Sequence, residues 1–420
     1  MALWVPVIWL LIIASRSVSV WLGLVSTNTP QSLLEGSPVD EFVLGSLLTA
    51  GIIVLIRRNR RTRVLFTKNW PILFYFFYCL VSILWSDFPG VAFRRWIKAV
   101  GDVVMVLVVV TDAKPLVALR RFLSRTSFIL LPTSLLLIKY FGDLGRAYDP
   151  YGHQTITGVT TNKNILGVVT FVLSLGAMWR VLTLLRGKDQ PNRSRHLLAQ
   201  GTLLGIGIVL LLMADSVTST TCFVLGSGLM VANDLHVLRR GPTSMHMLVF
   251  GLLMTGVAVF LGGENAVVHA MGRQSDLTGR TAIWDAVIPM SPNLMLGAGF
   301  ESFWLGSRLD RMWHAFPVFQ PNEAHNGYIE IYLNLGWVGL GLIGMILVTG
   351  YQHAAGLFRH DPATGSLMVA YIVAAAIYSI SEAGFRSLNP MWVFLLLAIF
   401  SSGAVRRVGW PRLVNSNAGT

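Results

Sequence analysis

The chain has 420 residues, of which 54% are hydrophobic and only 13% carry a charge. Thirteen Trp residues and a positive mean hydropathy accompany this bias. The composition excludes an ordinary soluble globular protein and is typical of a polytopic membrane protein.

Twelve apolar stretches are long enough to cross a bilayer as helices, since one crossing needs roughly 20 residues. They predict an all-α polytopic membrane protein of about twelve transmembrane helices. The first stretch lacks a preceding positive segment, so we expect it to be retained rather than cleaved as a signal peptide. The expected spans are residues 4–24, 40–56, 70–86, 97–112, 127–141, 164–185, 197–214, 217–234, 246–263, 331–351, 366–384 and 390–405.

The formal net charge of +13 would suit a nucleic-acid partner, but the basic residues gather after even-numbered spans. The positive-inside rule then places both termini in the cytoplasm, and the charge reflects topology rather than affinity for nucleic acid. The clusters are Arg57, Arg58, Arg60, Arg61, Arg63 and Lys68, then Lys114, Arg120, Arg121 and Arg125, then Arg186, Lys188, Arg193 and Arg195, then Arg239 and Arg240, and last Arg406, Arg407 and Arg412.

This orientation divides the chain into three parts. Residues 1–263 hold spans 1–9, and residues 331–420 hold the last three spans and a cytoplasmic tail. Between them, residues 264–330 form a long polar loop with short helices outside the cytoplasm. A loop of this length is usually functional.

Several catalytic motifs are absent. The sequence has no Walker loop, no Rossmann glycine triad, no HExxH and no CxxC pair, which argues against an ATP-driven pump, a nicotinamide enzyme and a zinc protease. An Asp-rich pair for a metal-bound nucleotide sugar is also missing. We therefore expect neither a metal ion nor another cofactor.

Arg280 is the first candidate functional residue of the loop. The segment Thr278–Val287 has the apolar spacing of a short amphipathic helix, capped by Asp276 or Thr278 and stopped by Pro289. Arg280 would then lie near the helix N-terminus, where free N–H groups already favour an anion. The alternative is an ordinary ion pair with Asp276 or Asp285 on a solvated face.

His325 is the second candidate. With Asn322 as the cap, His325 would lie in the first turn of the tenth span, at the membrane surface. A helix N-terminus disfavours imidazolium, so the ring should stay neutral and able to accept a proton. The alternative is a hydrogen-bonded structural histidine.

Other cations on the expected outer side extend the prediction. Arg94 and Arg95 precede the fourth span among aromatic residues, where interfacial anchoring is the alternative. Arg146 and Lys163 flank a loop and would add to a diphosphate-binding rim. Two acids within spans, Asp102 and Glu382, are candidates for a proton relay, but we interpret both as packing or interfacial groups.

Several short segments resemble the superfamily of O-antigen ligases and Wzy-type polysaccharide polymerases. The region Trp85–Asp102 is most similar to exopolysaccharide polymerases of the ExoQ type. The segments are Trp85–Pro89, Asn162–Asn164, Leu277–Trp284, Gly297–Trp304, His325–Tyr328 and Leu335–Gly339.

The resemblance implies a helix bundle related to the C-type glycosyltransferases, in the bacterial inner membrane with a periplasmic active site. It implies inverting transfer of a glycan from undecaprenyl diphosphate to an acceptor, without metal or nucleotide. His325 matches the family's catalytic base, and Arg280 matches a diphosphate ligand. Arg94, Arg95 and Arg146 match by region only. The further predicted substrate-binding residues are Lys163, Asn326 and Tyr328.

Three alternatives stay open at this point. The acceptor is either another lipid-linked chain, as in a polymerase, or the lipid A core, as in an O-antigen ligase. A transporter or flippase of lipid-linked glycans would use the outer cations as a substrate path without bond chemistry. A structural membrane protein with an inert loop is the third. The expected partners are the lipid-linked donor, the acceptor, membrane lipids and a chain-length regulator.

Overall fold

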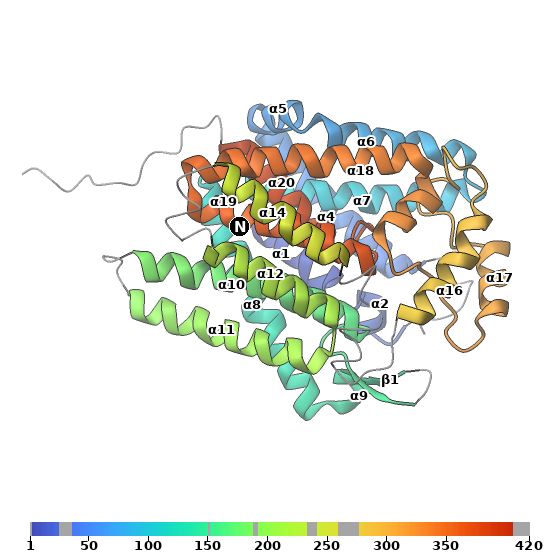
Figure 1. The fold of residues 1–420 in the computed structure, drawn as a ribbon, viewed down its shortest axis with the longest axis horizontal. Helices are drawn as coiled ribbons and strands as arrows, with labels where there is room; N and C mark the ends of the chain where they lie inside the picture. Colours follow the sequence, from blue (N-terminus) through green and yellow to red (C-terminus); the bar gives the residue numbers. More distant parts are fainter. Residues whose placement is uncertain are drawn as a thin grey trace, which may run out of the picture.

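The computed structural model describes residues 2–24, 36–149, 152–187, 192–232, 242–258 and 277–405. Most of them are helical, and Figure 1 shows most helices running along the long axis of the molecule. In this part of the chain the β-structure is an antiparallel pair of short strands, β1 (Arg146–Tyr148) and β2 (Gln154–Ile156), which follows the short helix α9 (Gly142–Gly145). The structure is therefore that of an all-α protein.

Each of the twelve apolar stretches lies on a helix, because backbone groups that leave water must bond within their own segment. The first stretch is divided between α1 (Trp4–Ile13) and α2 (Val18–Trp21), and the third between α6 (Trp70–Val81) and the 3-10 helix η1 (Ser82–Trp85). The others are α4 (Pro38–Arg57), α7 (Pro89–Val110), α8 (Pro115–Tyr140), α10 (Lys163–Arg186), α11 (Arg193–Ala214), α12 (Val217–Ala232), α14 (Pro242–Val257), α18 (Gly327–His360), α19 (Pro362–Ser381) and α20 (Pro390–Val405).

Length and apolarity allow six of the described helices to cross a membrane, namely α4, α8, α10, α11, α18 and α19. A seventh crossing is added if α5 (Asn59–Lys68) and the segment Trp70–Trp85 count as one span, although they meet at 87°. The helices α1, α12, α14 and α20 are apolar but shorter. The fold is consistent with a multi-pass membrane protein, whereas the expected number of twelve crossings stays a prediction.

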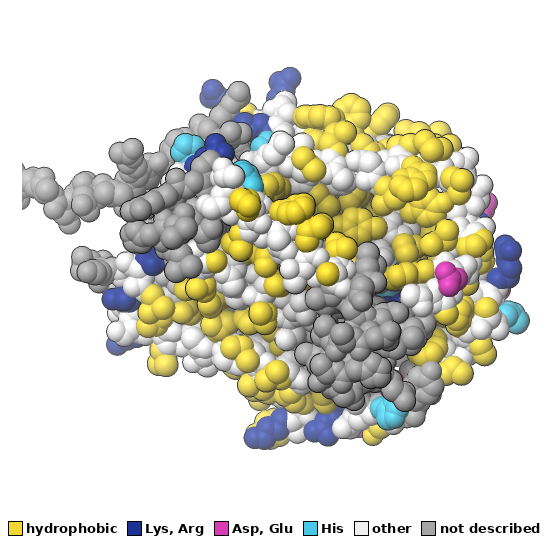
Figure 2. All heavy atoms as spheres, in the orientation of Figure 1, with side chains coloured by type: hydrophobic (Ala, Val, Ile, Leu, Met, Phe, Trp, Pro, Cys, Tyr) yellow, Lys and Arg dark blue, Asp and Glu magenta, His cyan; other side chains and the backbone are white. Residues whose placement is uncertain are grey.

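Helix α19 lies at the centre of the bundle, where it packs against α12, α18 and α20. Its side chains are apolar or small around the whole circumference, so neighbours can cover every face. By contrast, α4 and α11 leave large apolar side chains such as Ile56 and Leu212 exposed. Figure 2 shows hydrophobic side chains spread between the two ends of the molecule, as expected for a surface that faces lipid.

The two ends of the bundle differ in chemistry. One end, here called the loop end, carries α16 (Leu277–Val287), the 3-10 helix η3 (Ile288–Met290) and α17 (Ser307–Ala315), at the right of Figure 1. The other, the basic end, carries α5, the start of α8 and the last turn of α10. Helix α16 confirms the helix expected before Pro289, while Asp276 lies outside the described residues.

Helix α18 is interrupted at one residue, and this break lets the loop end bind to the bundle. Gly336 has φ 63° and ψ −162°, a conformation almost restricted to glycine. Beside it, Ala298 N donates to Leu333 O at 2.9 Å and Trp337 N donates to Leu294 O at 3.0 Å. The backbone groups released by the break are thus bonded to the loop that precedes α17. The first two turns of α18 are thereby held against the loop end.

Candidate active site

The centre of the candidate site is Glu382, the residue that follows α19. The residue is buried, with 4% of its surface exposed. Its backbone oxygen accepts a hydrogen bond from Gly327 N at 3.0 Å. Its carboxylate reaches elements from three distant parts of the chain, at the beginnings of α10, α16 and α18. We had interpreted Glu382 as a packing or interfacial group, and the structure shows instead that it joins the candidate residues.

Arg280 lies in the first turn of α16 and binds the end of α19. Its Nη2 contacts Glu382 Oε1 at 2.7 Å, and its Nη1 donates to the backbone oxygen of Ser381. Asn164 Nδ2 donates to the same Oε1 at 3.1 Å. The alternative of a pair with Asp285 on a solvated face is wrong, because the Arg280 side chain is only 18% exposed and pairs with Glu382.

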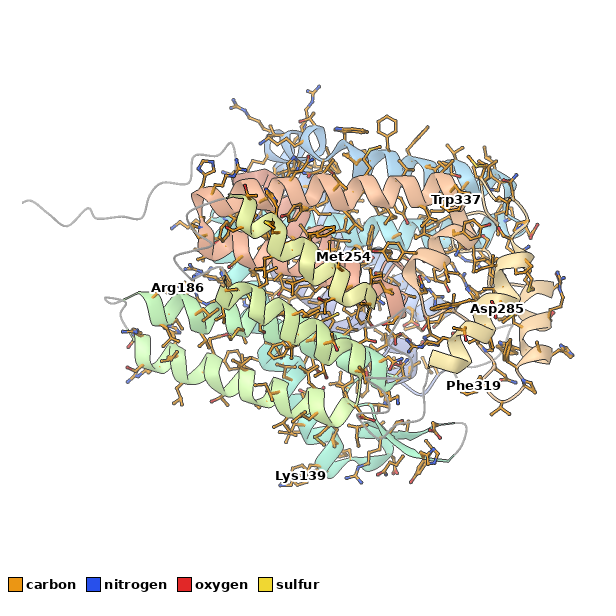
Figure 3. The ribbon with its side chains drawn as sticks, viewed as in Figure 1. Lys139, Arg186, Met254, Asp285, Phe319 and Trp337 are labelled. Atoms are coloured by element: carbon orange, nitrogen blue, oxygen red, sulfur yellow. The ribbon has the colours of Figure 1, made fainter. Side chains whose placement is uncertain are left out.

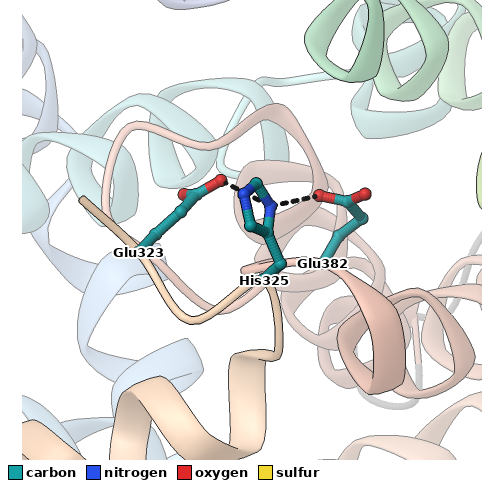
Figure 4. Close-up of side chains that lie close together, drawn as sticks. All are labelled: Glu323, His325 and Glu382. Atoms are coloured by element: carbon teal, nitrogen blue, oxygen red, sulfur yellow. Dashed lines mark hydrogen bonds and ion pairs between the residues drawn. The ribbon is translucent and has the colours of Figure 1, made fainter. Parts of the chain in front are cut away.

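His325 lies between two carboxylates, as Figure 4 shows. Its Nδ1 is 3.1 Å from Glu323 Oε1 and 3.4 Å from Glu382 Oε2. The side chain is 30% exposed, so another molecule can reach the ring. Glu382 therefore contacts both predicted catalytic residues, one on each carboxylate oxygen.

The local position of His325 differs from the expectation. It precedes α18 instead of lying in its first turn, and its φ of 48° is left-handed. The helix cap is Asn326 rather than Asn322: its Oδ1 accepts from Tyr328 N at 3.0 Å and Ile329 N at 3.1 Å. Because His325 is outside the helix, its ring is free to turn toward Glu382.

The charge state of the site also differs from the expectation. Burial lowers the pKa of His325, but the attraction of Glu323 and the hydrogen bond to Glu382 outweigh it and raise the pKa above its usual value. Burial raises the pKa of Glu382, but Arg280 and His325 together lower it below its usual value. The helix end was expected to disfavour the charged form of the ring, whereas the two nearby carboxylates favour it and raise the pKa of His325.

A second ion-pair layer surrounds Glu323. Arg386 Nη1 contacts Glu323 Oε2 at 3.4 Å, and Arg386 Nε contacts Glu301 Oε2 at 3.3 Å. Burial lowers the pKa of Arg386, but Glu301 and Glu323 raise it above its usual value. Arg95 donates to the backbone oxygen of Glu301 and so joins the same layer from α7.

The remaining predicted residues divide between the site and the scaffold. Lys163 is the first residue of α10 and directly precedes Asn164, whose side chain donates to the carboxylate of Glu382. Arg94 pairs with Glu41 at 3.4 Å. Arg146 lies on β1, where its guanidinium donates to Ile138 O at 3.0 and 3.2 Å.

Asn326 and Tyr328 support the fold around the site. Besides capping α18, Asn326 donates from Nδ2 to Ile380 O at 2.8 Å. The Tyr328 hydroxyl donates to Ala376 O at 3.0 Å. Both side chains thus attach the start of α18 to α19.

The same geometry has a bearing on metal binding. Three side chains each offer one ligand atom, and these three atoms lie within 4.8 Å of one another, which is close enough to hold a cation. The side chains are those of Glu323, His325 and Glu382. Each carboxylate is already paired with a guanidinium, however: Glu382 with Arg280 and Glu323 with Arg386. Two permanent cations therefore already supply the charge that a metal ion would bring.

Sequence reasoning missed Glu323, Glu382 and Arg386 as members of one site. Neither Arg386 nor Glu323 carries a local sequence signal for the site beyond the proximity of Glu323 to His325. Glu382 had a usable signal, since a carboxylate at the end of an apolar span is a functional candidate by default.

Comparison with known proteins agrees with the predicted resemblance. A family model described as O-antigen ligase matches residues 202–344, a range that includes both Arg280 and His325. The exopolysaccharide production protein ExoQ of Rhizobium meliloti (strain 1021) is 27% identical over 349 residues, which cover 80% of this chain and 76% of that protein. With its apolar helix bundle and its site at one end, the chain is similar to O-antigen ligases and to ExoQ, and both comparisons support a membrane protein of an O-antigen ligase or ExoQ-like type.

Proposed function

We propose that this protein is a membrane glycosyltransferase that moves a glycan from undecaprenyl diphosphate to an acceptor hydroxyl. The family supports an enzyme of the O-antigen ligase or polymerase type that acts in exopolysaccharide production. The observation that carries the finer proposal is the contact of one buried carboxylate, Glu382, with both Arg280 and His325.

His325 is suited to act as the general base. Both carboxylates contact Nδ1, so the tautomer with the proton on Nδ1 is favoured and Nε2 keeps its lone pair. Nε2 takes the proton of the acceptor hydroxyl while the hydroxyl oxygen attacks the anomeric carbon of the donor. The rate gain from such a base is roughly 100- to 10,000-fold.

Arg280 is suited to bind the leaving group. As the new glycosidic bond forms, the bond between the anomeric carbon and the diphosphate oxygen breaks, and its electron pair leaves with the diphosphate. A guanidinium has five N–H donors, and the contacts with Glu382 and Ser381 occupy only part of them. The remaining donors would stabilise the negative charge that develops on the diphosphate.

The surrounding cations would extend this binding surface. Lys163 precedes Asn164 at the start of α10, and Asn164 contacts the same oxygen of Glu382 as Arg280 does. Arg95 and Arg386 lie one layer further out, with Glu301 between them. Arg94 and Arg146 have scaffold contacts, so we assign them to the rim of the site at most.

The reaction would need no metal ion, because Arg280 and Arg386 supply the positive charge. The site would face the periplasm, since the described basic clusters, on α5, near the start of α8 and at the end of α10, lie at the basic end, and the positive-inside rule assigns them to the cytoplasm. The inverting outcome follows from a single displacement at the anomeric carbon.

The similarity to ExoQ favours the polymerase among the two acceptor classes. The acceptor would then be another lipid-linked chain, and the product an elongated exopolysaccharide. Ligation to lipid A core is the second candidate, because the matching family model is described as O-antigen ligase.

The proposal is tested by reconstituting the full chain in liposomes with an undecaprenyl-diphosphate oligosaccharide. Chain lengthening identifies a polymerase, and transfer to added lipid A core identifies a ligase. His325→Ala should abolish product formation while the protein still binds the donor lipid. A transporter would instead keep its flux after this substitution and would make no product.

His314→Ala is the matched control, since His314 lies exposed on α17 at the same end of the molecule. It should retain activity within about twofold, as surface substitutions usually have small effects. Equal loss of product in both variants would contradict the assignment of His325 as the base.

A further inference from the structure

A second cluster of cations lies at the basic end, away from the candidate active site. Arg120 of α8 and Arg180 of α10 both stand against the indole of Trp179, with guanidinium carbons 5.8 and 5.9 Å from the ring centroid. Trp179 is 1% exposed, and its Nε1 donates to Ala363 O at 2.8 Å. Three helices, α8, α10 and α19, therefore meet at this ring.

Neither guanidinium has a contacting acid in the part of the chain that the structure describes. No carboxylate lies within 4.0 Å of either, and the Nε of Arg120 is buried without a hydrogen-bond partner. Asp361 attracts Arg120 electrostatically, but its Oδ1 caps α19 by accepting from Thr364 N at 3.1 Å. Two like charges and an unsatisfied buried donor are thus held around one indole.

Ordinary anchoring explains only part of this arrangement. A cation beside an aromatic face is favourable, and an Arg near a helix end can extend its head group toward the interface. Neither effect satisfies the buried donor of Arg120, which costs free energy when unpaired. Neither offsets the repulsion between the two guanidinium groups. An anion between the two groups would accept a hydrogen bond from the buried Arg120 donor and would also offset their repulsion.

We propose that Arg120 and Arg180 bind the phosphate of an anionic phospholipid headgroup. Planar guanidinium groups match phosphate oxygens in charge and geometry. Basic pockets between transmembrane helices on the cytoplasmic side are known to take such headgroups.

The depth of the site favours a lipid over a free anion. Arg120 lies roughly 8 Å inside the start of α8, and Arg180 roughly 9 Å inside the end of α10, at 1.5 Å per residue. Figure 3 labels Arg186, which ends α10 at this end of the molecule. Leu116, which lies one turn before Arg120 on the same face of α8, is apolar and partly buried, so it can contact an acyl chain.

The site is independent of the proposed reaction. Asn164, which contacts Glu382, lies 16 residues before Arg180 on α10, roughly 24 Å along the helix. A lipid bound here would fix the relative positions of α8, α10 and α19. Two of these helices, α10 and α19, carry Lys163, Asn164 and Glu382 at the loop end.

The test uses the purified full chain and native mass spectrometry, with phosphatidylglycerol, phosphatidylcholine or inorganic phosphate added in turn. The variants are Arg120→Gln and Arg180→Gln. Arg121→Gln is the matched control, because it removes the same charge from the adjacent, exposed position of the same helix. Thermal unfolding of each variant with each addition gives a second readout.

Wild type and Arg121→Gln should retain phosphatidylglycerol with at least about tenfold higher affinity than either site variant, as expected for loss of a charge-assisted hydrogen bond. Phosphatidylcholine should not be retained. If Arg120→Gln fails to fold, Arg120→Lys serves in its place, since it keeps the charge and removes the buried Nε donor. Equal loss in the Arg121 control, or equal stabilisation by inorganic phosphate, would overturn the proposal.

Discussion

At the scale of single residues, the chemistry of the candidate site comes from shared contacts. His325 and Arg280 have little functional meaning apart, since a histidine near a helix is usually structural. Glu382 links them with its two oxygens, and Glu323 contacts the same Nδ1 of the imidazole. The catalytic proposal therefore depends on two carboxylates as much as on the predicted base and cation.

The pH dependence of activity is a first test at this scale. A general base works when deprotonated, and the pKa of His325 is raised, so activity should rise with pH through a midpoint above the usual histidine value. Glu323→Gln removes one of the charges that raise this pKa. The midpoint should then move down by about one pH unit.

The measurement is the pH profile of kcat/KM in reconstituted protein. Asp285→Asn is the control, since this exposed residue of α16 has no part in the network around His325. An unchanged profile in Glu323→Gln would mean that another group sets the observed midpoint.

Glu382→Gln is the second prediction for a residue. The substitution keeps the size of the side chain but leaves the largely buried Arg280 without its counter-charge. Loss of one partner from a buried ion pair costs about 3 kcal/mol or more. We expect thermal unfolding at a lower temperature together with loss of transfer activity.

Double substitution separates the two effects. If Arg280→Gln is added to Glu382→Gln, the uncompensated charge disappears and stability should partly recover, whereas activity should not. Full recovery of activity in the double variant would show that the ion pair is only structural.

At the scale of elements, the resemblance motifs turn out to pack on one another. The Trp85–Pro89 segment contacts the Gly297–Trp304 segment, where the Ser86 hydroxyl lies 2.7 Å from the Ser302 hydroxyl. Gly299 has φ 91°, and a Cβ there would meet the backbone of Ser82. These short motifs are distant in sequence, but they contact each other in the structure and thereby attach the loop end to the bundle.

The break in α18 is the third prediction. Gly336→Ala would place a Cβ against the backbone of Met295 and Leu296, in a conformation that only glycine adopts readily. The strain alone costs about 1 to 3 kcal/mol, and the collision adds to it. We expect lower thermal stability and lower activity, because the start of α18 and His325 would shift.

Gly341→Ala is the matched control on the same helix, since nothing lies within 4 Å of its would-be Cβ. It should be neutral or stabilising by up to about 1 kcal/mol, because alanine is the better helix former. Equal effects of the two substitutions would show that the break at Gly336 has no special importance.

At the scale of the whole molecule, the two ends have opposite roles. The loop end gathers the proposed reaction at the starts of α10, α16 and α18, while the basic end carries α5 and the proposed lipid site. The charges that orient the protein are therefore separated from the charges proposed to act on substrate.

Membrane orientation is the fourth prediction, and cysteine labelling can measure it. The two native cysteines, Cys79 and Cys222, are completely buried, so the chain has a low background. In intact cells, a membrane-impermeant maleimide at the inner membrane's outer face should label Ser307→Cys on α17. Thr67→Cys on α5 should be labelled only after the membrane is permeabilised. The reverse pattern would place the candidate site in the cytoplasm and exclude a periplasmic transfer reaction.

The sequence by itself determined the helices and the two candidate residues. Long apolar runs predict helices because lipid leaves the backbone no other partners, and each predicted stretch lies on one. Arg280 and His325 stood out because each was expected near the start of a helix and each lies in a motif that resembles the family.

Only the tertiary structure decided which groups surround those residues. Glu382 is 102 positions from Arg280 and 57 positions from His325, and no local pattern encodes contacts at such separations. The same holds for the pKa of His325, because the local rule about helix ends predicted that the charged form of the ring is disfavoured. The folded chain brings two carboxylates to that ring, and Coulomb attraction over about 3 Å outweighs the partial charge of a helix end.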